Sequence, residues 1–216
     1  MSTPPTPGSQ RLLSSGDALL APATDLLEAL RQIAAATLAD DQVATRAEID
    51  RFLRAHRDAA LRSCVQAHLT GSALVANATA QRTLLMLHRK LGRWFQPGGH
   101  ADGNTNLAAV ALQEATEETG IIGLRILVPA IDVDIHRVAL PNEAPHLHLD
   151  VRHVVIAPAG AREVANRESL ALRWVDATGL DDLDPPIDPS TRRLVARGLE
   201  HARHVLAEQT PRSQPR

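Results

Sequence analysis

The segment from Gly98 to Gly120 most constrains what this chain can fold into, because a glycine pair leads into a helix that ends in clustered acids. A helix is predicted from a cap at Asn104, Thr105 or Asn106 to a left-handed glycine at Gly120. Its apolar residues share one face, which suits packing on a sheet: Ala108, Ala111, Leu112 and Ala115.

The acids of this helix are Glu114, Glu117 and Glu118, which fall on one face of its last turns. A helix C-terminus carries about half a unit of negative charge, so carboxylates are disfavoured there. Like charges at this spacing also cost about 0.2–0.5 kcal/mol per pair. A divalent cation would relieve both effects, and oxygen-only ligands suit Mg²⁺ or Mn²⁺. The alternative for an isolated acidic helix end is simple solvation; the glycine loop and the glycine stop favour the metal.

This segment resembles the Nudix box. The residues in register with the box are Gly99, Glu114, Ala115, Glu117, Glu118, Gly120 and Ile121. Two positions depart, since Thr105 stands where the box has Glu and Gln113 where it has Arg. The resemblance implies an α/β sandwich with a mixed sheet, and hydrolysis of a diphosphate bond in a nucleoside diphosphate linked to another moiety.

The resemblance also implies site residues. Glu114, Glu117 and Glu118 would hold Mg²⁺ or Mn²⁺, with the Gly99 carbonyl a further candidate ligand. Gln113 can donate a hydrogen bond to Glu117 but adds no positive charge, a loss of about 1 kcal/mol. We therefore expect a slower enzyme and not an inactive one, and Thr105 can still serve as a helix cap.

Other polar residues are candidates for proton transfer and substrate binding. In several branches of the family a Glu before the last strand acts as general base, so Glu168 is a candidate beside Glu117, and Glu118 completes the catalytic set. Arg89 and Arg93 precede the glycine loop and could bind substrate phosphates; a solvated basic turn is the alternative.

The stretch from His146 to Arg152 alternates strictly, which is typical of a strand with one polar face. Its polar face is either solvated or binds substrate through His148 and Arg152, with His136 on the preceding strand. A second metal site is also conceivable, but two histidines of a His-x-His pair do not complete a tetrahedral zinc site.

The rest of the chain divides into four parts. Residues 1–15 and 206–216 are predicted to be disordered tails, residues 16–68 a helical segment, and residues 69–205 the Nudix-like domain. The first helix is expected to be capped at Thr24, and the second to run through residues 44–63 with Leu61 buried and Cys64 just beyond it in a continuing helical pattern. Two hairpin-like pairs of strands predict a mixed α/β sheet and not a doubly wound one.

Composition narrows the remaining classes. A formal net charge of −2 argues against a stable nucleic-acid complex, and a single cysteine excludes an intramolecular disulfide. No signal peptide or apolar stretch of about 20 residues is evident, so a cytoplasmic protein with no membrane segment is expected. The expected partner is a small-molecule nucleotide diphosphate derivative, and a homodimer is a candidate assembly.

Two other functions fit the same sequence. The departures at Thr105 and Gln113 allow a nucleotide-binding or sensor module with weak or no turnover on the same fold. The N-terminal helices allow an interaction protein in which those helices are the working part.

Overall fold

A computed structural model describes residues 10–139 and 144–209 of the chain. Its centre is an eight-stranded sheet in the order β1-β6-β7-β2-β3-β4, with β5 paired to β2 and β8 paired to β3. Only β2 and β7 run parallel among these pairs, so the sheet is mixed, as predicted. The strands are β1 Arg11–Ser14, β2 Ala67–Ala76, β3 Thr83–His88, β4 Arg93–Phe95, β5 Gly98–His100, β6 Arg125–Val138, β7 His146–Ile156 and β8 Ser169–Val175.

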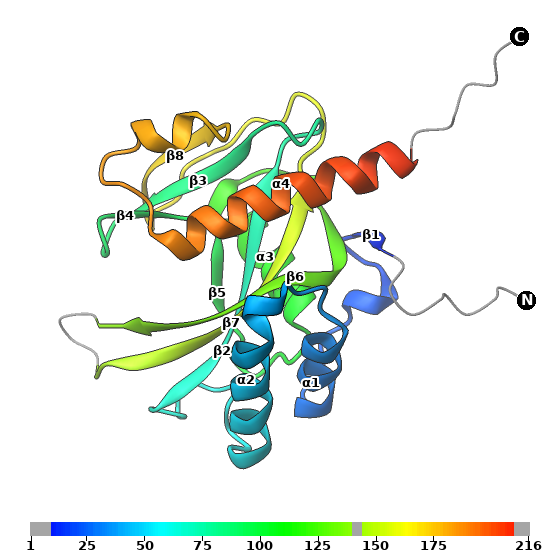
Figure 1. Cartoon of the computed structure of the whole chain (residues 1–216), viewed down its shortest axis with the longest axis vertical. Coiled ribbons are helices and arrows are strands. Elements are labelled where there is room, and N and C mark those ends of the chain that lie inside the picture. The colour runs from blue at the N-terminus through cyan, green and yellow to red at the C-terminus, as the bar shows by residue number, and fades with distance from the viewer. Residues whose placement is uncertain (1–9, 140–143, 210–216) are drawn as a thin grey trace, which may run out of the picture.

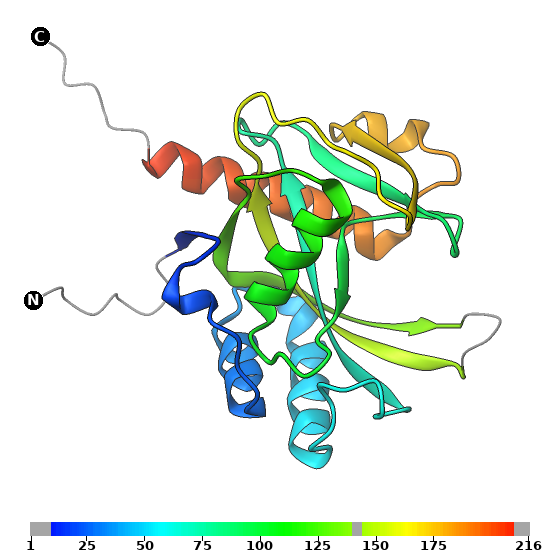
Figure 2. The same cartoon turned by 180° about the vertical axis from the view of Figure 1, so that it is seen from behind.

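Helices cover both faces of this sheet. The helix α4 crosses one face (Figure 1), and α3 crosses the other (Figure 2). In the described ranges the α-helices are α1 Leu26–Ala35, α2 Val43–Ala55, α3 Leu107–Thr119 and α4 Pro189–Gln209. Short 3-10 helices lie at Ala18–Leu20, Asp40–Gln42 and Gly179–Asp182. The predicted α/β sandwich is confirmed.

The alternation of side chains along β2 separates the two faces. A Cβ on Gly71 would lie 2.8 Å from the Leu107 carbonyl of α3, whereas Leu74 packs against Gly198 of α4. Even-numbered β2 residues therefore face α4 and odd-numbered ones face α3. The α4 face is apolar beneath the helix but polar further along β2, where His68 and Thr70 lie.

The termini of α3 agree with the sequence. The Asn106 side chain caps the helix by accepting a hydrogen bond from the Ala109 amide at 3.3 Å. Gly120 ends it with φ at +65°, a conformation that side chains disfavour. Small residues on the buried face let α3 approach β2 closely: Ala108, Ala111 and Ala115.

The N-terminal helices differ from the prediction at their ends. Asp25, and not Thr24, caps α1 by accepting from the Leu27 amide at 2.9 Å. The helix α2 ends at Ala55, so Leu61 lies in a turn and is 45% exposed. Cys64 is buried as a free thiol, but in the bend that leads into β2 and not in a helix.

Regular structure extends into both of the segments that were predicted to be disordered tails. Residues 11–14 form β1, which pairs with β6 because Leu13 is buried against the sheet. At the other end, α4 continues past residue 205 to Gln209. Residues 1–9 and 210–216, also assigned to the tails, lie outside the described residues. Within the described ranges, no helix combines the length and the apolar character needed to cross a membrane.

Candidate functional site

The acidic end of α3 lies directly over β5. Glu118 is buried, and its carboxylate accepts a hydrogen bond from the Gly98 amide at 2.9 Å. A Cβ on Gly99 would fall 2.6 Å from both carboxylate oxygens of Glu114. Glycine at position 99 therefore makes the space that the Glu114 carboxylate occupies.

Two of these carboxylates have raised pKa values. Burial, reinforced by Glu117 and Glu168, raises the pKa of Glu114 to about 7. Burial raises the pKa of Glu118 to about 8, against the hydrogen bond from Gly98. The metal-free protein thus places acids where their charges are poorly compensated, and a bound cation would reverse this.

The other two carboxylates of the cluster are exposed. Gln113 donates from Nε2 to Glu117 Oε1 at 2.9 Å, which is the contact expected in place of the family's arginine. Glu168 belongs to the same group, since its charge contributes to the raised pKa of both Glu114 and Glu118. Asn166 links the two segments, because its side chain donates to the Glu117 carbonyl and accepts from the Glu168 amide.

An ion pair that the sequence analysis missed lies beside this cluster. Arg62 binds Asp102 through two hydrogen bonds of 2.8 Å. Both residues act on the pKa of Glu114, Asp102 raising it and Arg62 lowering it. The two are separated by 40 positions along the chain, so no local pattern could have paired them.

The two predicted phosphate-binding arginines near the glycine loop have different surroundings. Arg89 bonds backbone, since its guanidinium donates to the carbonyls of Arg167 at 2.9 Å and Ser169 at 3.1 Å. Its amide also donates to the Glu168 carbonyl at 2.7 Å, so Arg89 positions the segment that carries Glu168. Arg93 is exposed on β4.

Arg152 does not occupy the surface position expected of a phosphate ligand. It is 3% exposed, and its guanidinium binds Asp150 at 2.7 Å and Asp134 at 3.0 Å. It also donates to Ser190 in the first turn of α4 at 2.6 Å. Although burial opposes it, Arg152 holds the pKa of Asp150 below its usual value. These contacts hold α4 on the sheet, and they leave the Arg152 guanidinium unavailable to a substrate.

The two predicted histidines lie on the α4 face of the sheet. His136 Nδ1 lies 3.1 Å from Asp134 Oδ2, and its ring centroid is 5.2 Å from that of His148. Gly99 and His100 are consecutive on β5, so His100 points to the face opposite Glu114. The histidines and the glutamates thus flank β5 from its two sides.

Thr105 has a structural position. It is completely buried, and its hydroxyl donates to the Asp25 carbonyl at 2.9 Å while its amide donates to the Ala23 carbonyl at 2.7 Å. Asn106 is the cap of α3, so Thr105 does not perform that role. The residue that departs from the Nudix box is therefore one that binds the N-terminal segment.

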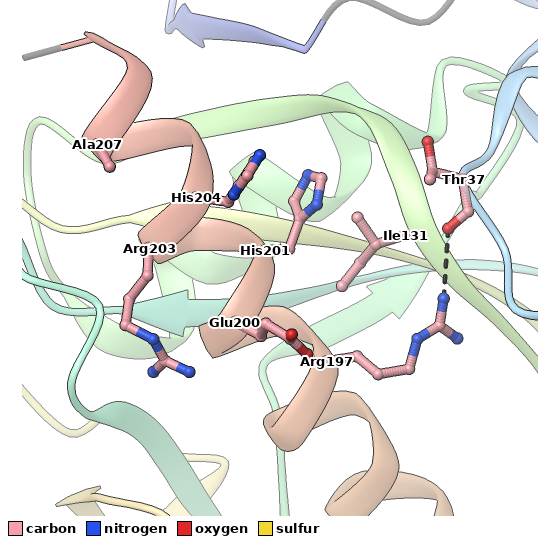
Figure 3. Close-up of a pocket in the computed structure, with 8 residues that line it drawn as sticks. All are labelled: Thr37, Ile131, Arg197, Glu200, His201, Arg203, His204 and Ala207. Carbon is pink, nitrogen blue, oxygen red and sulfur yellow. Dashed lines mark hydrogen bonds between the residues drawn. The ribbon is translucent and has the colours of Figure 1, made fainter.

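A shallow hollow lies along α4, between its C-terminal half and the segment after α1 (Figure 3). Arg197 donates across it to the Thr37 carbonyl at 3.4 Å. The residues that line this hollow are Thr37, Ile131, Arg197, Glu200, His201, Arg203, His204 and Ala207. None of the acidic residues described above is among them.

Fold and site together define an α/β sandwich protein that sets carboxylates against the glycines of the short strand β5, the class that hydrolyses phosphorus-containing anhydrides. The family profile of the NUDIX domain matches residues 68–198, and the chain belongs to the Nudix family. It is accordingly a Nudix-type hydrolase acting on such anhydrides.

One solved structure supports the fold. A NUDIX-family hydrolase from Clostridium perfringens is 20% identical, with a TM-score of 0.51 over 62% of this chain and 97% of that chain. The Nudix hydrolase RenU from M. smegmatis is 22% identical, with a TM-score of 0.45 over 68% of this chain and 90% of that chain. The search of curated proteins found no match.

Proposed function

We propose that this protein is a Mg²⁺- or Mn²⁺-dependent pyrophosphohydrolase that cleaves a diphosphate bond in a nucleoside diphosphate linked to another moiety. The observation that carries the proposal is that the half-buried carboxylate of Glu114 and the buried carboxylate of Glu118 lie against Gly99 and Gly98. Stability alone would not select acids at this position, because both have raised pKa values in the metal-free protein.

The residues present fit a divalent cation. Glu114, Glu117 and Glu118 offer carboxylate oxygens on one side of α3, and the Gly99 carbonyl is a further candidate ligand. When bound, such a cation supplies Lewis-acid stabilisation of phosphate oxygens and lowers the pKa of water.

Proton transfer is assigned to exposed carboxylates of the cluster. Glu168 is the first candidate base, since Arg89 and Asn166 hold the backbone of its segment. Glu117 is the second, and its hydrogen bond from Gln113 orients the carboxylate without a positive charge. A general base acts by taking a proton from the attacking water in the transition state, which requires a carboxylate within hydrogen-bond reach of that water.

The substrate contacts proposed are fewer than the sequence suggested. Arg93 is retained as a phosphate ligand because its side chain is exposed. His136 is retained as a candidate at the polar end of the sheet, and His148 is left out because its ring packs among His68, His100 and His146. Arg89 and Arg152 are left out, since their guanidinium groups bond the protein itself.

The direct test is hydrolysis of a panel of diphosphate compounds, such as ADP-ribose, nucleotide sugars and oxidised dNTPs, with Mg²⁺ or Mn²⁺. We expect release of a nucleoside monophosphate by the wild type and a loss of at least about 100-fold in kcat/KM in Glu118→Gln. Glu208→Gln, an exposed change on α4, is the matched control.

Calorimetry with Mg²⁺ or Mn²⁺ separates this proposal from its rival. Metal uptake that Glu117→Gln and Glu118→Gln abolish supports the site. Metal-dependent nucleotide binding without hydrolysis across the panel would instead favour a sensor module. The cytoplasmic location and the homodimer stay predictions.

A further inference from the structure

Four histidines from three strands converge at the polar end of the α4 face. They are His68 on β2, His100 on β5, and His146 and His148 on β7. His68 and His148 are directly paired between the parallel strands, and His100 pairs with Thr70, two residues from His68. One nitrogen from each ring can be chosen so that all four atoms lie within 4.8 Å of one another.

Backbone carbonyls fix two of these rings. His68 Nδ1 lies 3.3 Å from the Cys64 carbonyl, and His146 Nδ1 lies 2.9 Å from the Ala144 carbonyl. A carbonyl oxygen can only accept, so each Nδ1 carries the proton and each Nε2 presents a lone pair. Metal-binding histidines are oriented in this way by a second hydrogen bond to the protein.

The Nε2 atom of His68 differs from the other ligand candidates in being buried without a hydrogen-bond partner in the described part of the chain. His68 is 4% exposed, and this nitrogen is buried with no hydrogen-bond partner among the described residues. Leaving a buried acceptor unpaired costs about 1–3 kcal/mol. The ring centroids of His100, His146 and His148 lie 4.6–5.2 Å from the ring centroid of His68.

We propose that His68, His100, His146 and His148 form a four-coordinate Zn²⁺ site, separate from the carboxylate site on the other side of β5. Imidazole nitrogens suit Zn²⁺, whereas Mg²⁺ and Mn²⁺ prefer oxygen. The two metal sites therefore differ in ligand chemistry and can be loaded independently.

The spacing of the nitrogens fits this ion. With Zn–N bonds of about 2.0–2.1 Å, two ligands of a tetrahedral site lie about 3.3 Å apart. His146 Nε2 and His148 Nε2 are already 3.2 Å apart. The four nitrogens lie within 4.8 Å of one another, so the other pairs have to close by at most about 1.5 Å, through small rotations of the half-buried rings of His100, His146 and His148 about His68.

The consequence concerns β5. A Zn²⁺ ion bound by these residues would link β5 to β2 and β7 through His100. The same short strand carries Gly98 and Gly99, against which Glu118 and Glu114 lie. The zinc ion would thereby hold the floor of the carboxylate site in place without taking part in the reaction.

The test is direct metal binding to an untagged, metal-free chain. We expect one Zn²⁺ per chain by elemental analysis, a rise in Tm on loading, and the intense visible absorption of four-coordinate Co²⁺ after Co²⁺ substitution. His68→Gln and His148→Gln should each weaken Zn²⁺ binding by at least about 100-fold, the upper end of what loss of an outer partner costs.

The matched control is His204→Gln, an exposed histidine on α4 outside the group. Melts of each metal-free variant show whether it folds, and the Co²⁺ spectrum of the wild type tests the coordination without any substitution. Absence of stoichiometric Zn²⁺ in the wild type, or unchanged affinity in the folded histidine variants, would overturn the proposal in favour of simple ring packing. Zn²⁺ binding that Glu118→Gln removes would also overturn it, since the ion would then lie at the carboxylate site. None of these readouts depends on hydrolysis.

Discussion

At the scale of single residues, the site depends on how closely the acids of α3 approach β5. Gly99 is the sharpest case, because the Glu114 carboxylate occupies the place where a side chain would begin. The sequence pairs these residues through the Nudix box, but only the structure shows that they are in contact. Glycine here is required by the neighbour and not by the backbone.

Gly99→Ala should therefore displace Glu114. We expect kcat/KM to fall at least about tenfold, because a misplacement of about 1 Å can cost 100-fold in rate. Gly179→Ala is the control, since a Cβ there meets only ordinary contacts, the nearest at 3.5 Å. Equal activity of both variants would show that Glu114 is not needed where the structure places it.

Gln113→Arg tests the departure from the box. The arginine would replace a neutral hydrogen bond to Glu117 with a charge-assisted one, a gain of about 1 kcal/mol. If the gain falls on the transition state, kcat should rise about fivefold in steady-state assays. Gln81→Arg, exposed and outside the carboxylate cluster, should leave kcat unchanged. A fall in kcat of Gln113→Arg would mean that glutamine is the better partner in this chain.

The raised pKa values of Glu114 and Glu118 predict a pH dependence of stability. Between about pH 6.5 and 8, the folded metal-free protein binds more protons than the unfolded chain, whose carboxyls titrate near 4.5. Its free energy of unfolding should therefore fall as pH rises through this window. The buried histidines titrate below 6.5 and act mainly at lower pH.

Urea denaturation at several pH values measures this slope. Saturating Mg²⁺ should reduce it, because the cation replaces the protons. Glu114→Gln combined with Glu118→Gln should flatten it without metal. Slopes that are the same in all three samples would contradict the assigned pKa shifts.

At the scale of elements, the N-terminus of α3 is where this chain departs from its family's pattern. Thr105 and Asn106 bond the segment before α1, through the carbonyls of Asp25 and Leu19 among others. The side chain of Gln32 on α1 in turn accepts from the Ala108 amide at 3.1 Å. The helix is thus held at its start by an element outside the Nudix box.

Restoring the family residue by Thr105→Glu should accordingly destabilise the protein. The carboxylate would enter a fully buried position and remove the hydrogen bond to Asp25, a cost of about 3 kcal/mol. For a chain of this size that lowers Tm by about 10 °C. Thr79→Glu, in an exposed turn, is the control. A Tm unchanged by Thr105→Glu would show that the contact with the N-terminal segment is weak.

At the scale of the whole molecule, the N-terminal helices complete the core. Ile33, Ile49 and Leu53 pack with Leu149 and Val151 of the sheet in one buried cluster. These helices cover part of the same sheet face as α3 (Figure 2). This shared core argues against an interaction protein in which the N-terminal helices work separately from the rest of the chain.

Deletion of residues 1–65 should leave a chain that no longer unfolds cooperatively, because the apolar face of β7 becomes exposed. Circular dichroism melts and dye binding measure this. Ile49→Ala is the milder variant and should cost about 2–5 kcal/mol while hydrolysis at low temperature persists. A truncated chain that folds and hydrolyses normally would make the helices accessory.

The sequence by itself determined the class of fold, the bounds of α3 and the grouping of three glutamates at the end of that helix. These features are local, since a cap, a helical period and a glycine stop each depend on neighbouring residues. The predicted bounds of α2 and of both tails were wrong because packing on the sheet, and not the neighbouring residues in the sequence, decides where these elements begin and end.

Only the tertiary structure decided which polar residues work together. Arg152 looked like a substrate ligand because its strand alternates, but three aspartates from two strands bury it. His68 and His100 carried no motif and were not considered, yet strand pairing brings them to His146 and His148. Register between strands far apart in sequence sets these contacts, and it follows from which faces are buried once the strands have assembled.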